Sequence, residues 1–146
     1  MAITQAIANS FKKQLLEGDA NFSNSGGDVF KLALYTSSAT LNSATTSFTT
    51  SNEVSPTGQY ASGGGKLVNN GTSITAGVAR CDFADRSFTN VSLTARGALI
   101  YNTSSTSTNA AVAVLDFGAD KTATSGVFTI QFPANTSTAA ILRISG

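Results

Sequence analysis

The sequence predicts a mainly β protein: an antiparallel, jelly-roll-like β-sandwich with one N-terminal α-helix. Apolar residues recur at four-residue spacing before Gly18, whereas from Val29 onward they alternate with polar residues along short segments. Turns rich in Ser, Thr, Asn and Gly separate these segments, as in sandwiches and barrels built from many short strands. We expect residues 1–146 to form a single domain, which is large enough to bury its own core.

The N-terminal helix is expected over residues 3–17. Gly18 follows it, and glycine is the residue that most often ends a helix in the left-handed conformation. Such a surface helix buries its apolar face either against the chain's own sandwich, which is the more common arrangement, or against a neighbouring subunit. The candidate assembly contacts are therefore the four apolar residues that would share one face: Ile3, Ile7, Phe11 and Leu15.

The β-sandwich is expected from about residue 29 to residue 146. Its first strand covers Val29–Thr36, where apolar side chains occupy every second position. A long polar excursion follows over residues 37–65 and contains the glycine run Gly63–Gly65. A segment of this length without strong periodicity is typical of a functional or mobile loop.

The second half of the chain carries more strand patterns than the first. The segments 94–101 and 110–117 flank a Ser/Thr-rich turn, so we expect them to pair as a hairpin. The dipeptide Asn70-Gly71 is typical of a tight turn. The strands expected in this half cover residues 66–69, 73–83, 87–92, 94–101, 110–117, 127–132 and 139–144.

The composition excludes several kinds of site. With no histidine, Ser-His-Asp and Cys-His catalysis and histidine metal sites are absent, and Cys81 alone can form no internal disulfide. Only 12% of the residues are charged and the net charge is +1, so no electrostatic footprint for nucleic acid is visible. No signal-peptide pattern and no apolar run of membrane-spanning length occurs. We expect no cofactor, no metal and no membrane partner.

Four carboxylates lie at expected strand ends and are the remaining catalytic candidates. Paired carboxylates can catalyse glycoside hydrolysis or hold calcium. A cation, Arg86 or Lys121, is near each pair, so we expect the carboxylates to cap backbone amides or to pair with those cations. The absence of tryptophan, a common platform for sugar rings, also argues against a glycosidase. The four residues are Asp82, Asp85, Asp116 and Asp120.

Five blocks of this sequence are similar to a family of small structural proteins encoded by tailed bacteriophages. The resemblance implies a virion component without enzymatic activity, made in the bacterial host cytoplasm, and it brings no catalytic residues with it. The blocks are residues 1–18, 30–41 (FKLALYTSSATL), 94–102 (TARGALIYN), 111–121 (AVAVLDFGADK) and 127–133 (VFTIQFP).

The first expectation is a capsid decoration, or cement, protein that binds and stabilises the major capsid shell. It would do so as a homo-oligomer, with a trimer favoured. The alternatives are a tail or head–tail connector protein, which would contact other virion proteins, and a carbohydrate-binding module, which the missing tryptophan disfavours. Because charges are few, we expect binding to the virion to depend little on salt.

Overall fold

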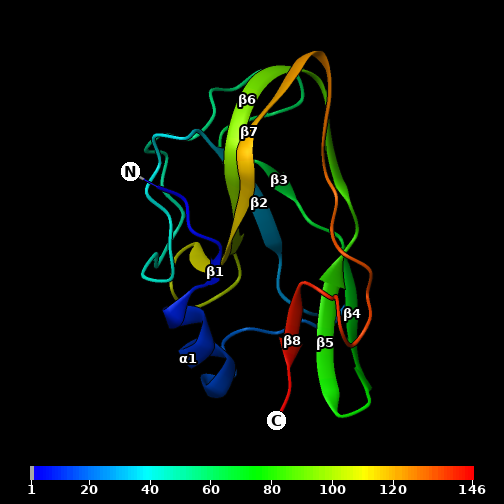
Figure 1. Ribbon diagram of the computed structural model, residues 1–146. Helices are drawn as coiled ribbons and strands as arrows, with labels where there is room; N and C mark the ends of the chain where they lie inside the picture. Colours follow the sequence, from blue (N-terminus) through cyan, green and yellow to red (C-terminus); the bar gives the residue numbers. More distant parts are fainter. Residues whose placement is uncertain (1) are drawn as a thin grey trace.

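The computed structural model describes residues 2–146 and confirms a mainly β fold, with two antiparallel sheets and one short helix, consistent with a β-sandwich (Figure 1). The elements are β1 (Ala6–Ile7), α1 (Asn9–Glu17), β2 (Phe30–Tyr35), β3 (Gly65–Lys66), β4 (Asn69–Thr75), β5 (Val78–Phe83), β6 (Arg86–Asn102), β7 (Ala110–Ile130) and β8 (Leu142–Ile144). The five-stranded sheet has the order β1-β7-β6-β2-β3, and the three-stranded sheet the order β4-β5-β8.

The expected hairpin between residues 94–101 and 110–117 is confirmed, but its strands are longer than predicted. β6 and β7 pair from Asn102–Ala110 to Arg86–Ile130. Register shifts interrupt this pairing at several points, and each shift disturbs the alternation of side chains without ending the strand. A period-two pattern therefore divides one bent strand into two shorter ones, which is why the sequence predicted separate strands here.

The predicted strand over residues 73–83 is wrong, because the chain reverses in its middle. Ala76 and Gly77 have φ angles of 53° and 78°, the positive values required by a tight hairpin turn between β4 and β5. Ala76 fits the apolar alternation of the segment, so the pattern does not reveal the turn. Asn70-Gly71 instead lies inside β4, where the register shifts between Asn69 and Thr72.

The helix is also shorter than the predicted 3–17. It begins at Asn9, and Ile3 forms a parallel bridge with Leu41 while β1 pairs with β7. Four-residue spacing is a multiple of two, so Ile3 and Ile7 also share one face of an extended strand, and pairing with the sheet decides between the two structures. The expected helix end is confirmed, since Gly18 takes a left-handed φ of 73° and its N–H bonds to the preceding turn.

The polar excursion over residues 37–65 packs against the five-stranded sheet. Its apolar residues Leu41, Val54 and Tyr60 are buried in the core. Three tyrosine hydroxyls tie it to β2 and β6: Tyr35 and Tyr101 donate to the carbonyl oxygens of Thr49 and Gly63, each at 2.6 Å, and Tyr60 accepts from the Leu34 amide at 2.8 Å.

Candidate functional site

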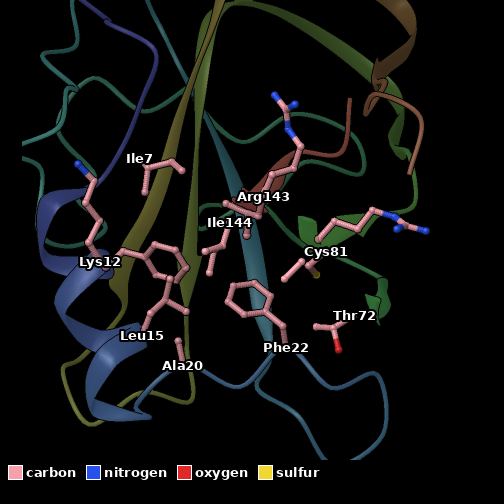
Figure 2. Close-up of a pocket in the computed structure, with 13 residues that line it drawn as sticks. Ile7, Lys12, Leu15, Ala20, Phe22, Thr72, Cys81, Arg143 and Ile144 are labelled. Carbon is pink, nitrogen blue, oxygen red and sulfur yellow. The ribbon is translucent and has the colours of Figure 1, made fainter. Parts of the chain in front are cut away.

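An apolar groove of about 440 Å³ separates α1 from the three-stranded sheet (Figure 2). Ile7, Phe11 and Leu15 line it on the side of β1 and α1, and Cys81, Leu142 and Ile144 line it on the side of β5 and β8. Phe22 lies between the two sides, and its ring centroid is 5.7 Å from that of Phe11 in an edge-on arrangement. The groove is therefore open to solvent, and two aromatic side chains of the core, Phe11 and Phe22, form part of its lining.

The register of the three-stranded sheet explains its apolar side of the groove. Residues directly opposite one another in antiparallel strands point to the same face. Pairing places Thr72, Cys81 and Leu142 in one row, all of which line the groove. The next row is Ile74, Ala79 and Ile144, and here the two isoleucines are 74% and 62% exposed. The apolar surface thus continues beyond the groove.

Three cations also line the groove: Lys12, Arg80 and Arg143. Over residues 2–146, the ion pairs are Lys13–Glu17 and Arg96–Asp116, so none of the three has a carboxylate partner. Their hydrogen bonds go to neutral groups, among them the carbonyl oxygen of Asn135 for Arg80 at 3.2 Å and that of Thr138 for Arg143 at 2.7 Å. The groove has an apolar lining and an uncompensated positive rim.

The four predicted assembly contacts divide into two pairs. Ile3 and Phe11 are buried in the chain's own core, so the chain's own fold covers this part of the apolar stripe. Ile7 and Leu15 are only partly buried and line the groove, where they stay candidate contacts. Leu16, next to them on α1, is 91% exposed. Leu16 is not among the predicted contacts, although an apolar side chain outside the four-residue spacing of the helix was a usable signal.

Three of the four carboxylate candidates, Asp82, Asp85 and Asp116, cap backbone amides, as expected. Asp85 accepts from the amide of Phe132 at 2.8 Å, and Asp116 accepts from that of Gly118 at 2.9 Å. The expected cation partners were wrong. Asp116 pairs with Arg96, at 3.5 Å between Nε and Oδ1, rather than with Lys121.

The guanidinium of Arg86, the other expected cation partner, lies 4.6 Å above the Phe88 ring, where the ring's quadrupole attracts it. In the part of the chain that the structure describes, no group of three His, Cys, Asp or Glu side chains is placed to hold a metal ion.

Cys81 and Asp82 are buried side by side on β5. Burial, with a smaller contribution from the neighbouring Asp82 carboxylate, raises the pKa of the Cys81 thiol to about 12, so the thiol is protonated at neutral pH. Asp82 is 1% exposed and accepts from the amide of Phe83 at 2.9 Å. Burial also raises the pKa of Asp82, which the Phe83 hydrogen bond only partly offsets.

The raised pKa of Asp82 predicts a pH-dependent stability. The folded state binds this proton more tightly than the unfolded state, so the stabilisation is complete below the ordinary pKa of 3.8 and is lost as the pH rises through the folded value. Relative to Asp82→Asn, the wild-type free energy of unfolding should therefore fall as the pH rises through this interval. Urea titrations at a series of pH values measure it, and Asp120→Asn controls for the loss of one surface carboxylate. Parallel profiles for wild type and Asp82→Asn would contradict the prediction.

No model of a known protein family matches this chain, and no curated protein or solved structure matches it significantly. The resemblance to bacteriophage structural proteins therefore rests on the five sequence blocks alone. Over residues 2–146, the structure contains no helix that is both long and apolar enough to cross a membrane. The fold and the groove together define the class of the chain as a small β domain with an apolar, positively rimmed surface groove.

Proposed function

We propose that this chain is a non-enzymatic structural protein of a bacteriophage virion that decorates the capsid and stabilises the major capsid shell. The observation that carries the proposal is the apolar surface at the groove, formed by the partly buried Ile7 and Leu15 and the exposed Ile144, with the exposed Leu16 next to Leu15 on α1. Large apolar side chains that stay exposed next to one another favour a protein contact. The blocks that resemble phage structural proteins support the proposal, since residues 1–18 supply β1 and α1, which line the groove, and residues 111–121 belong to β7, with which β1 pairs.

Covering the groove would give the domain its affinity for the shell. Removing apolar surface from water stabilises a contact by roughly 25 cal/mol per Å². A stable protein interface buries about 1,600 Å² in total, which is more than one groove of this size offers. A homo-oligomer, with a trimer favoured, would present several grooves at once and raise the avidity without any new kind of contact.

The proposal predicts that the exposed apolar residues at the groove and beside it on α1 act in binding rather than in folding. Leu16→Ser and Ile144→Ser should each weaken binding to purified capsids by about tenfold, while the free energy of unfolding changes by less than about 0.5 kcal/mol. Co-sedimentation with capsids stripped of the protein measures the first quantity. The matched control is Val68→Ser, which removes an apolar side chain that is 63% exposed and belongs to neither α1 nor β8.

Normal coating of capsids by both folded groove variants would contradict the proposal. The copy number in purified particles then separates the two virion positions. A number comparable to that of the major capsid protein supports decoration, whereas the copy number of a single ring supports the tail or head–tail connector. Mass spectrometry of intact particles measures it.

A second cleft favours the carbohydrate-binding alternative. It has a volume of about 530 Å³ and runs along β7, where the rings of Phe117 and Phe128 lie 6.1 Å apart. Asp116, Gln5 and Gln131 supply polar groups beside these rings. Aromatic faces next to hydrogen-bonding side chains are what a sugar requires. Binding of the purified protein to a glycan array, lost in Phe117→Ala, would favour this function over decoration.

A further inference from the structure

β8 is an edge strand whose outer side is free. Its one neighbour in the sheet is β5. In the part of the chain that the structure describes, no backbone hydrogen bond joins Leu142, Arg143 or Ile144 to any element other than β5. All three residues line the groove, and β8 lies on the side of its sheet nearest α1 (Figure 1). An unpaired edge of this kind is a template for a further strand.

The register of β8 dictates what such a strand must carry. Side chains alternate between the faces of a strand, and Leu142 and Ile144 share their face with Cys81 at the groove. Residues opposite Leu142 and Ile144 in an added strand would continue these rows into the groove, so they must be apolar. The residue between them would lie beside Arg143, on the other face.

The charge on that other face is unbalanced. Arg143 lies directly opposite Arg80 on β5, and like charges in this position destabilise a strand pair. Neither arginine has a carboxylate partner within the described residues 2–146. A carboxylate opposite Arg143 in an added strand would supply the missing negative charge. Lys12, on the α1 side of the groove, is a third cation without an acidic partner.

We propose that an extended segment of a partner protein, with the pattern apolar–acidic–apolar, adds to β8 as a strand and fills the groove with its apolar side chains. A helix in the groove would leave the free backbone groups of β8 without partners, whereas an extended chain pairs with them. Because Arg80 and Arg143 lie opposite each other on that face without a carboxylate partner, binding of the acidic segment is expected to weaken as salt rises, unlike the weak salt dependence expected from the overall composition.

A partner other than a second copy of this chain fits best. The sequence contains two apolar–acidic–apolar triplets, Cys81–Phe83 and Leu115–Phe117. Both already lie within paired strands, the first in β5 and the second in β7, so neither is free to leave the fold. The inference rests on the proposed function in one respect: the partner that carries the acidic segment is taken to be a protein of the capsid shell.

The test uses three short synthetic peptides that differ only at the centre, which reads Val-Glu-Val, Val-Gln-Val or Val-Lys-Val. Titrated into the ¹⁵N-labelled full chain, the Glu peptide should shift the amides of Leu142, Arg143 and Ile144 and bind about fivefold more tightly than the Lys peptide. Arg143→Gln should abolish this preference. Lys66→Gln should keep it, because it removes an exposed cation from β3, an edge strand of the other sheet.

Three results would overturn the inference: equal affinities for the Glu and Lys peptides, amide shifts that avoid β8, or a bound peptide that is helical. Self-association of the free chain that protects the β8 amides would overturn it as well. Peptide binding needs no virion, so the two proposals fail separately. If the chain coats capsids while the β8 amides stay unprotected, the result supports decoration and contradicts strand addition. If the peptides bind to β8 but the chain does not bind capsids, the result supports strand addition and contradicts decoration.

Discussion

Gly64→Ala is expected to lower the free energy of unfolding by about 3 kcal/mol or more, enough to unfold a domain of ordinary stability. Gly64 has a φ of +77°, and a Cβ built there would lie 1.7 Å from the carbonyl oxygen of Leu32. That oxygen belongs to the backbone of β2, which is paired with β6 on one side and β3 on the other. Relieving the clash requires β2 or the segment leading into β3 to move, which disturbs the pairing of these two strands.

The matched control is Gly26→Ala. Gly26 has a φ of +75°, but a Cβ there would meet nothing within 4 Å. This variant carries only the cost of a left-handed alanine, about 1 kcal/mol. Urea unfolding followed by circular dichroism measures both variants, and the difference between them isolates the contact with Leu32. Equal losses of stability would show that the glycine run does not approach β2 as closely as the structure has it.

Phe11→Ala is expected to destabilise the fold by about 3 to 5 kcal/mol. Its ring is 2% exposed and packs edge-on against Phe22, which stacks on Phe30 with centroids 4.4 Å apart. This chain of contacts joins α1 to the five-stranded sheet. Truncation to alanine would leave a cavity where the helix meets the core.

Leu16→Ala is the control on the same helix. At 91% exposed, Leu16 should contribute less than about 0.5 kcal/mol to folding. In capsid binding we expect the opposite order. Per folded molecule, Leu16→Ala should lower the affinity for capsids more than Phe11→Ala, because the buried Phe11 affects binding only through the stability of the fold. Thermal unfolding and co-sedimentation on the same preparations test both orders. A large loss of stability in Leu16→Ala would mean that the helix packs with its other face inward.

The parts of the fold that follow from the sequence are those with an unbroken local pattern. β2, the β6–β7 hairpin and the helix end at Gly18 belong to this class. The turn at Ala76–Gly77 could not be predicted in this way, because Ala76 continues the apolar alternation and the usual Asn-Gly pair is missing. The start of the helix depends on whether β1 pairs with β7, a contact between distant segments that no local pattern contains.

The groove was predictable on one side only. Ile7 and Leu15 follow from spacing along the N-terminal segment. Leu142, Arg143 and Ile144 reach the groove through the pairing of β8 with β5, two strands that are far apart in the sequence. Part of the positive rim was hidden for the same reason, since Arg80 and Arg143 become neighbours only through this strand pairing.

The pairing of Ala6 with Val114 has a consequence for the order of folding. The β6–β7 hairpin can close from its turn outward, since Asn102 and Ala110 are near neighbours and each further pair encloses little additional chain. β1 must instead close a loop of most of the chain's length. During synthesis, Ile3, Ile7 and Phe11 leave the ribosome long before Val114. Their apolar side chains therefore stay exposed to water until β7 has formed. We therefore expect the N-terminal segment to dock late, onto a sheet that has already formed.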